Sequence, residues 1–184
     1  GGKKMEYQFL GCSGLRVSEV CLGTMAFGVS VDEAAAKGIV DMAFDCGVNF
    51  MDTANTYAGG LSEEMLGKAL VGRREEVVIA TKFTNPTGKG PNDSGMSRKH
   101  ILQAIEDSLR RLQTDYIDIY YLHHVETRAP LEEALRTMDD LVRQGKVRYL
   151  AVSNYEAWRL SETIWTCDTM GYAPIVCYQP QYSL

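Results

Sequence analysis

Short apolar runs alternate with helical patterns along most of the chain. The apolar runs lie at residues 20–24, 49–52, 77–82, 116–123, 147–153 and 174–179. The helical patterns lie between them, at residues 32–46, 62–70, 97–113, 130–145 and 155–170. Strands that are apolar throughout, rather than alternately apolar and polar, are typical of a parallel sheet covered by helices. We therefore predict an α/β fold in which six parallel strands alternate with five helices.

The residues at the ends of these segments support the same division. Residues 6–20 alternate around a glycine-bearing turn, which predicts a β-hairpin. Ser62 and Ser97 carry hydroxyl groups that can cap the helices they open, and Pro130 can begin a helix where a missing N–H group costs nothing. Residues 83–96, with three Gly and two Pro, are irregular, which favours a lid or substrate loop, with a flexible surface loop as the alternative.

Composition narrows the class of protein. The chain has 184 residues, 45% of them hydrophobic, a size usually met as one domain. Its net charge of -5 is scattered, which argues against a nucleic-acid or anionic-membrane surface, and no apolar run approaches the ~18 residues of a membrane span. We expect residues 1–4 to be a remnant of cloning before Met5, and residues 5–184 to be one domain. The start lacks the apolar core of a signal peptide, which predicts a cytoplasmic protein.

The five cysteines give no sign of a disulfide framework. Their number is odd, they form no CxxC spacing, and Cys21, Cys46 and Cys177 lie among apolar residues. This pattern predicts buried thiols of a reducing compartment and no metal site.

Polar side chains close five successive strands of the predicted sheet. They are Asp52, Lys82, His123, the pair Ser153 and Asn154, and Gln179. Active sites of parallel β/α barrels are built at the carboxyl ends of the strands, from residues of several strands. Each residue alone also has a structural explanation, as a turn residue, a solvated lysine, a core histidine or a helix cap. Five such endings in succession favour a functional site.

Alternation along the strands predicts which side chains share a face. The interior face would carry His123, Tyr121 and Ile119 from one strand, and Lys82, Ala80 and Val78 from another. His124 would then face away from the interior. Asp118 would face the helix layer, where we expect it to be paired. We expect His100 and the carboxylates of the helices to be solvated.

Asp52 is followed five positions later by Tyr57, in a polar loop with glycines. Tyrosine is a poor acid at neutral pH because its unperturbed pKa is ~10. A lysine ammonium a few ångströms away favours the phenolate, and a carboxylate keeps that lysine in place and protonated. A histidine can hydrogen-bond the carbonyl oxygen that the tyrosine protonates. Asp52, Tyr57, Lys82 and His123 together therefore predict a proton donor for a carbonyl group.

Such an acid needs a hydride donor. Ser153, Asn154 and Gln179 supply hydroxyl and amide groups, which suit the carboxamide of a nicotinamide and are not preferred metal ligands. The hydride donor would then be a cofactor. No GxGxxG motif follows the first strand, so a Rossmann-type site is not supported.

At these residues the chain resembles the aldo-keto reductases. DTANTYAGGLSEEMLG is similar to the family's Asp-and-Tyr signature, ATKF to its lysine strand and YIDIYYLHH to its histidine strand. AVSNY resembles the Ser-Asn pair that contacts nicotinamide in the family, and YQPQYSL resembles the sixth strand with its Gln. The likeness runs from Tyr7 to Leu184 and includes the opening hairpin, which closes the bottom of the barrel in this family.

The resemblance implies a parallel (β/α)8 barrel of the TIM type that reduces aldehydes and ketones and prefers NADPH. It implies that the catalytic residues are Asp52, Tyr57, Lys82 and His123. It implies a cofactor site formed by Asp52, Ser153, Asn154 and Gln179 around the nicotinamide, with Gly23, Thr24 and Met25 near its ribose. The loop GPNDSGMSRKHI is closer to the channel-associated β-subunits and to bacterial sugar- and general-aldehyde-type members than to the steroid-reducing ones.

The chain covers about six of the eight βα units, since a complete barrel needs about 250 residues. The part that grips the pyrophosphate and the 2′-phosphate in the family would follow Leu184, so NADH stays an alternative to NADPH. Six strands leave two open edges, and we expect either a natural continuation past Leu184 or self-association through these edges.

The expected function is reduction of a small carbonyl substrate with NAD(P)H, with no nucleic-acid partner and no membrane insertion. One alternative is a nicotinamide-binding regulatory subunit resembling the channel β-subunits. The other is a catalytically incompetent fragment.

Overall fold

The computed structural model describes residues 5–182, so the expected cloning remnant at residues 1–4 lies outside the described residues. One sheet of six parallel strands has the order β3-β4-β5-β6-β7-β8, so that each strand pairs with its neighbours in the sequence. These strands are Cys21–Gly23, Phe50–Asp52, Val78–Phe83, Ile117–Leu122, Val147–Ser153 and Ile175–Gln179. Before them, β1 (Tyr7–Phe9) and β2 (Arg16–Ser18) pair antiparallel in a separate hairpin.

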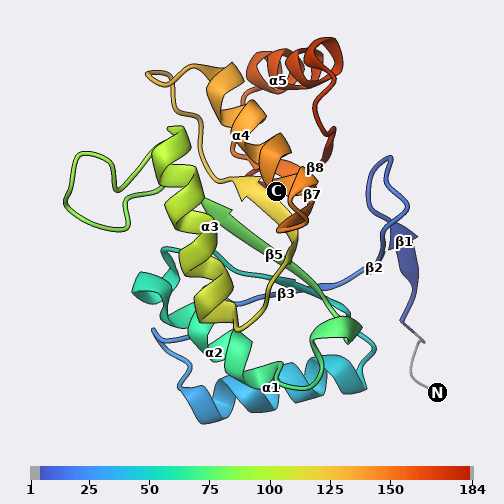
Figure 1. Cartoon of the computed structure of the whole chain (residues 1–184). Coiled ribbons are helices and arrows are strands. Elements are labelled where there is room, and N and C mark those ends of the chain that lie inside the picture. Colours follow the sequence, from blue (N-terminus) through green and yellow to red (C-terminus); the bar gives the residue numbers. More distant parts are fainter. Residues whose placement is uncertain (1–4, 183–184) are drawn as a thin grey trace.

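Within the described residues, five α-helices follow the strands and contact one another in sequence order around the sheet (Figure 1). They are α1 (Glu33–Asp45), α2 (Leu61–Ala69), α3 (Arg98–Leu112), α4 (Leu131–Arg143) and α5 (Ala157–Met170). Two short 3₁₀ turns, η1 (Tyr57–Gly60) and η2 (Arg74–Glu76), stand before α2 and β5. The predicted fold class is confirmed: the chain is an open half-barrel of six parallel strands with an N-terminal hairpin.

The two faces of the sheet carry separate apolar clusters. The outer cluster lies between the strands and the helices and includes Ile79, Tyr120 and Leu122. The inner cluster includes Val78, Ala80, Ile119 and Tyr121, together with Val17 of the hairpin. Successive residues of one strand thus belong to opposite faces, as the alternation predicts, and the hairpin covers part of the inner face.

A register shift between β7 and β8 aligns the last two strand ends. Leu150 pairs with Ile175, but Ala151 pairs with Cys177, so β8 contains one extra residue at this point. Because of the shift, Ser153 pairs with Gln179. The extra residue of a bulge reverses the faces of the residues that follow it, and here it puts Gln179 on the same face as Ser153.

Two glycines allow backbones to approach closely. A Cβ atom on Gly67 of α2 would lie 2.6 Å from the carbonyl oxygen of Arg111, so α2 packs directly against the end of α3. Gly11 in the hairpin turn has a φ of +55°, and its Cα faces the carbonyl of Val176 in β8. Any side chain at either position would push the two backbones apart.

The predicted cap of α2 is wrong. Gly60 is the N-cap and Leu61 the first helical residue, because the left-handed conformation of Gly60 ends the η1 turn there. The hydroxyl of Ser62 instead donates to the carbonyl of Thr24 and lies 3.0 Å from the hydroxyl of Thr53, joining α2 to the ends of β3 and β4. The predicted Ser97 cap of α3 is confirmed, since its hydroxyl accepts from the N–H of His100.

The prediction of buried thiols is wrong for three of the five cysteines. Cys12, Cys21 and Cys46 are exposed, Cys177 is half-buried and Cys167 is buried; all five thiols are free. Cys21 lies on β3, an edge strand of the sheet, and Cys46 is the C-cap of α1, so fewer neighbours cover them than their apolar sequence context suggests. No helix within residues 5–182 is long and apolar enough to cross a membrane.

Three residues that we expected to be solvated are buried. His100 is 3% exposed, and the Glu63 carboxylate is fully buried, where it accepts hydrogen bonds from the Thr81 hydroxyl and the Arg111 guanidinium. Asp139 of α4 is also buried, and its carboxylate accepts from Arg143 and from the N–H of Ala173. An ion pair can be buried in this way only when both charges have partners. The prediction for Asp118 is confirmed, since it pairs with Arg74 at 2.7 Å.

Candidate active site

A hollow of about 260 Å³ lies at the carboxyl ends of the strands. Its lining residues are Tyr57, Lys82, His123, Ser153, Asn154, Gln179, Pro180 and Gln181. These residues come from the η1 turn and from the ends of β5, β6, β7 and β8. The structure therefore brings together the polar residues at the strand ends that the sequence singles out. Asp52 does not line the hollow, but it forms an ion pair with Lys82, which does.

Lys82 is the centre of this group. Its side chain is almost fully buried, and its ammonium donates to the carboxylate of Asp52 and to the carbonyl of Thr53 at 2.7 Å. The same ammonium lies 3.5 Å from the hydroxyl of Tyr57, within reach of a weak hydrogen bond. One charged group thus connects the end of β4 to the phenol of the η1 turn.

Asp52 is buried next to its partner. Burial raises the pKa of the Asp52 carboxyl, and the Lys82 ammonium acts in the opposite direction. The side-chain amide of Gln179 lies close enough to the carboxyl to lower its pKa as well. One carboxylate oxygen is held by Lys82, and the other, Oδ2, is buried and makes no hydrogen bond of good geometry within residues 5–182.

Tyr57 reaches the strand ends because of the turn that carries it. Ala58, with a φ of +50°, and Gly59 and Gly60 are in the left-handed region, so the chain reverses direction immediately after the tyrosine. Tyr57 is half-buried and presents its ring edge-on to His123, with the ring centres 6.0 Å apart. The phenol therefore faces both the ammonium and the imidazole.

His123 follows the last residue of β6 and is 8% exposed. Burial, the nearby Lys82 ammonium and the neighbouring His124 lower the pKa of the His123 imidazole to about 4. At neutral pH the ring is therefore uncharged and carries a single N–H. His124 is exposed and stacks on it at 4.7 Å, so it is His123 that lines the hollow.

The ends of β7 and β8 present hydroxyl and amide groups. The Ser153 hydroxyl donates to the carbonyl of Gln179, and the N–H of Asn154 donates to the same carbonyl. Asn154 has a φ of +57°, and its amide nitrogen donates to the His123 carbonyl and to the Ser153 hydroxyl. Neither residue caps the next helix, because the N-cap of α5 is Glu156. The amide nitrogen of Asn154 is occupied, and its oxygen faces no protein donor among residues 5–182.

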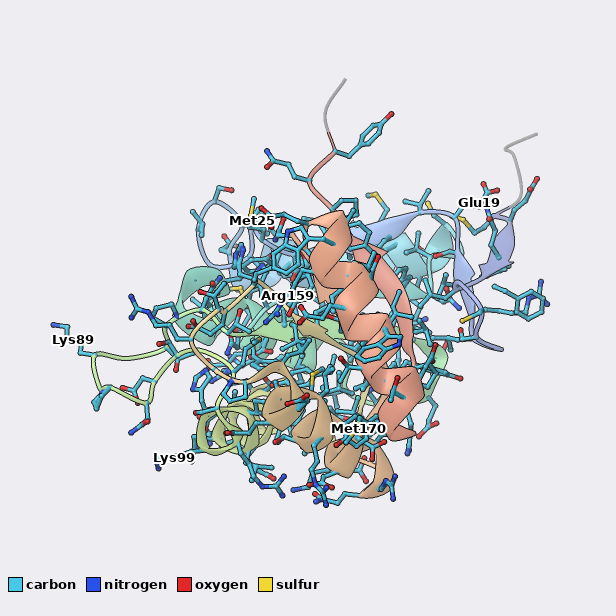
Figure 2. The ribbon with its side chains drawn as sticks, turned by 90° about the horizontal axis from the view of Figure 1, so that it is seen from above. Glu19, Met25, Lys89, Lys99, Arg159 and Met170 are labelled. Carbon is cyan, nitrogen blue, oxygen red and sulfur yellow. The ribbon has the colours of Figure 1, made fainter. Side chains whose placement is uncertain are left out.

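Gly23, Thr24 and Met25 do not line this hollow. Thr24 is buried, and its hydroxyl donates to the carbonyl of Asp52 at 3.0 Å, so its side chain supports the end of β4. Gly23 pairs with Asp52 in the sheet, and Met25 is 68% exposed and labelled in Figure 2. Their assignment to a ribose site stays a prediction.

Asn85 is a residue that the sequence reasoning missed. It stands three positions after Lys82, at the start of the long loop, and its amide nitrogen lies 3.4 Å from Nδ1 of His123. No periodic pattern places a loop residue against a strand end, so only the structure identifies it.

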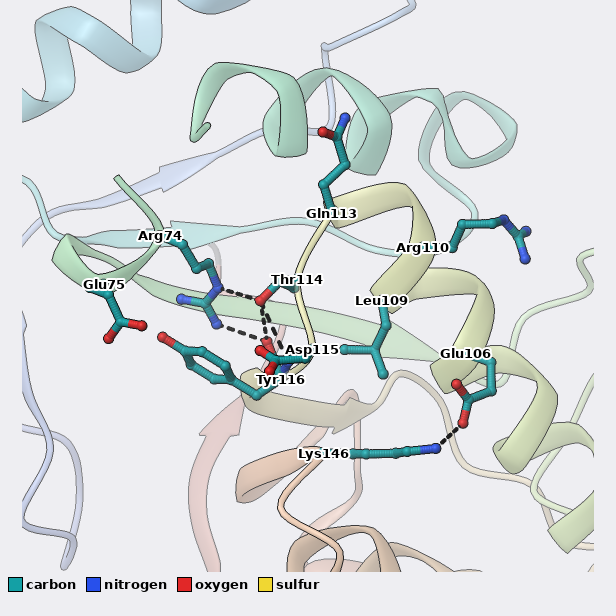
Figure 3. A pocket seen from close by; sticks show the side chains of 10 residues that line it. All are labelled: Arg74, Glu75, Glu106, Leu109, Arg110, Gln113, Thr114, Asp115, Tyr116 and Lys146. Carbon is teal, nitrogen blue, oxygen red and sulfur yellow. Dashed lines mark hydrogen bonds and ion pairs between the residues drawn. The ribbon is translucent and has the colours of Figure 1, made fainter. Parts of the chain in front are cut away.

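A larger hollow of about 810 Å³ lies at the other end of the barrel, before β5, β6 and β7, and Figure 3 shows its lining. Its polar groups bond mostly to one another: Arg74 donates to the Thr114 hydroxyl and the Tyr116 carbonyl, and Lys146 pairs with Glu106. In β/α barrels this end contributes stability rather than chemistry. Within residues 5–182, no group of three or more His, Cys, Asp or Glu side chains could hold a metal ion.

Comparison with known proteins adds independent information. Residues 19–184 match the model of the aldo/keto reductase family. The uncharacterized oxidoreductase YrpG of Bacillus subtilis (strain 168) is 44% identical over 191 residues, which cover 98% of this chain and 59% of that protein. Proteins named probable voltage-gated potassium channel subunit beta, from Oryza sativa subsp. japonica and Arabidopsis thaliana, are each 39% identical over 184 residues, covering 98% of this chain and 56% of theirs. The chain thus spans less than three fifths of the length of these relatives.

Proposed function

Because this chain belongs to the aldo/keto reductase family of oxidoreductases, we propose that it reduces aldehydes or ketones to alcohols with a nicotinamide cofactor. The observation that carries the proposal is the chain of contacts from Asp52 through Lys82 to the Tyr57 hydroxyl, beside His123 in one hollow. A pure binding site has no need of a phenol held next to a buried ammonium.

Each of the four side chains has a role in the proposed reaction. Tyr57 donates its hydroxyl proton to the carbonyl oxygen of the substrate. The Lys82 ammonium lies against that hydroxyl and favours the phenolate that forms, and Asp52 keeps Lys82 in place. His123, which is neutral, hydrogen-bonds the same carbonyl oxygen and orients it. The Tyr57 phenolate regains its proton from solvent.

The residues present fit a nicotinamide. A carboxamide needs hydroxyl and amide partners, which Ser153, Asn154 and Gln179 offer at the hollow. When bound, the cofactor would supply the hydride that the carbonyl carbon accepts. We propose NADPH, with NADH as the alternative, and a ribose near Gly23, Thr24 and Met25.

The test is turnover. The protein is mixed with NADPH and an aromatic aldehyde, and loss of NADPH absorbance is followed together with formation of the alcohol, with NADH in a parallel series and aldehyde-free mixtures as controls. We expect alcohol and oxidised cofactor in equal amounts. NADPH binding, seen as a change in its fluorescence, without any alcohol would contradict the proposal.

The plant relatives favour a second candidate function. Their printed names describe potassium channel β-subunits, so this chain could serve as a nicotinamide-binding regulatory subunit. That function predicts cofactor-dependent binding to a partner protein without turnover. A catalytically incompetent fragment would show neither turnover nor partner binding. A single domain over residues 5–184 and a cytoplasmic location both stay predictions.

A further inference from the structure

The loop that follows β5 begins with a strained residue. Thr84 is buried and has a φ of +102°, a conformation that β-branched residues rarely adopt. The loop between β5 and α3 then projects away from the barrel, with Lys89 at its outer tip (Figures 1 and 2). Backbone strain of this kind persists only where the surrounding structure holds it, and it often accompanies function.

Two hydrogen bonds hold Thr84 in this conformation, and a third holds the residue before it. The N–H of His124 donates to the Thr84 hydroxyl at 3.1 Å, and the N–H of Gly95 donates to the Thr84 carbonyl at 2.8 Å. The N–H of His123 donates to the carbonyl of Phe83, the residue before Thr84. The start of the loop is therefore attached to the two histidines that follow β6.

The result is that Asn85 meets the His123 ring. Its amide nitrogen lies 3.4 Å from Nδ1, and an amide nitrogen can only donate. The other ring nitrogen, Nε2, has no hydrogen-bond partner among residues 5–182. The ring lines the hollow that Tyr57 and Lys82 share.

Which nitrogen of His123 carries the proton decides what the ring can do. A neutral imidazole has one N–H, and a donor at Nδ1 leaves that proton on Nε2. The titratable groups that face the ring are Lys82 from β5, Tyr57 from the η1 turn and His124 from the strand end. The lysine charge disfavours a second proton on the ring, so the neutral form and its tautomer are the relevant ones at pH 7.

We propose that Asn85 is a positioning residue that holds His123 in the tautomer with its N–H at Nε2, so that this N–H is available to the carbonyl oxygen of a substrate. The strained Thr84 serves to aim the Asn85 amide at the ring. The substrate contact rests on the proposed carbonyl reduction, whereas the tautomer does not.

The tautomer can be measured without turnover. Long-range proton–nitrogen correlation spectra of the 15N-labelled protein distinguish a ring nitrogen that carries a proton from one that does not. Comparison with His123→Gln assigns the His123 signals among the three histidines. We expect the proton on Nε2 and an unprotonated Nδ1. A proton on Nδ1 in the unmodified protein would overturn the proposal.

Two variants of Asn85 sharpen the test. Asn85→Asp replaces the donor with an acceptor, which should reverse the tautomer, while Asn85→Ala should give a mixture. Asn92→Ala is the matched control, because Asn92 is an exposed residue of the same loop and should leave the His123 signals unchanged. Unchanged signals in Asn85→Ala and Asn85→Asp would also overturn the proposal.

Kinetics provide the second readout. Asn85→Asp should lower kcat about 10- to 100-fold at pH 7, as expected for lost hydrogen bonding to the reacting oxygen, with NADPH binding unchanged. The loss should shrink at lower pH, because a carboxylate at Nδ1 raises the pKa of His123, and a doubly protonated ring again has N–H at Nε2. A loss that is the same at every pH would indicate a purely structural effect. An inactive protein with the expected spectra would contradict the proposed function and leave the tautomer proposal intact.

Discussion

Removing the ammonium of Lys82 should destabilise the fold strongly, and by an amount that depends on pH. Lys82→Met keeps an unbranched side chain of similar length, so little cavity forms. The variant leaves the Asp52 carboxylate buried without its cationic partner, with the amide of Gln179 as the remaining donor nearby. Breaking a buried ion pair by removing one partner costs about 3–5 kcal/mol. Uptake of a proton by Asp52 relieves part of this, so we expect a loss of about 2–4 kcal/mol at pH 7.5.

The pH dependence follows from Asp52. Burial already raises its pKa with Lys82 present, and loss of the ammonium raises it further. A carboxyl group whose folded pKa lies above its unfolded value costs stability at high pH. This cost begins to decrease as the pH falls through the folded value, and it is gone below the unfolded value. The destabilisation by Lys82→Met should therefore be smaller at pH 5 than at pH 7.5.

Urea unfolding at fixed protein concentration, followed by the fluorescence of Trp158 and Trp165, measures these free energies. The set comprises the unmodified protein, Lys82→Met, Asp52→Asn and the double variant, each at both pH values. The double variant removes the isolated charge, so it should be at least about 1 kcal/mol more stable than Lys82→Met. The reasoning fails if Lys82→Met costs less than about 1 kcal/mol at both pH values, or if the two single effects simply add.

Three further outcomes are expected. The pKa of His123 is about 4, against the usual 6.5, so between these pH values the unfolded state binds a proton that the folded state does not. The contribution of His123 to the free energy of unfolding is therefore largest above pH 6.5 and is lost as the pH falls toward 4. With allowance for solvent near the ring, this pH-dependent part of the free energy of unfolding is about 1–2 kcal/mol. It should be absent from His123→Gln, and the same dependence of the free energy of unfolding on pH in both proteins would contradict the assignment. Gly67→Ala should cost about 1–3 kcal/mol by thermal unfolding because its Cβ meets the end of α3, whereas Gly38→Ala in α1, with open space around it, should stabilise by about 0.5–1 kcal/mol; equal effects would refute the packing argument. Finally, β3 and β8 lack a partner on their outer edges within the described sheet, so sedimentation of this 184-residue chain should show self-association, and a monomer at all concentrations would contradict it.

Most of the fold could be predicted from the sequence because it depends on two periodicities of apolar residues, that of strands and that of helices. Apolar runs such as residues 117–122 and helical spacing in α3 gave the order and class of elements, and alternation placed Lys82 and His123 on one face. The position of a polar residue at each strand end then sufficed to gather the candidate site. These signals are local. Because the strands of a parallel sheet end at the same edge, the local pattern of each strand is enough to determine which residues meet there.

The features that sequence reasoning missed depend on contacts between distant segments. Glu63 and His100 look like surface residues on helices, yet Arg111 and the loop before α3 cover them. Cys21 looks buried because its neighbours are apolar, but it lies on an open edge. Asn85 and the strained Thr84 belong to an irregular loop, where no period relates position to direction. Tertiary packing decides each of these cases.

The most direct test of the account is Tyr57→Phe. The substitution keeps the ring against His123 and removes only the hydroxyl that faces Lys82. If Tyr57 is the proton donor, kcat for aldehyde reduction should fall by about 100-fold or more while NADPH binding, measured by fluorescence titration, changes little. A Tyr57→Phe protein that reduces the aldehyde at a near-normal rate would contradict the central claim and direct attention to His123 as the acid.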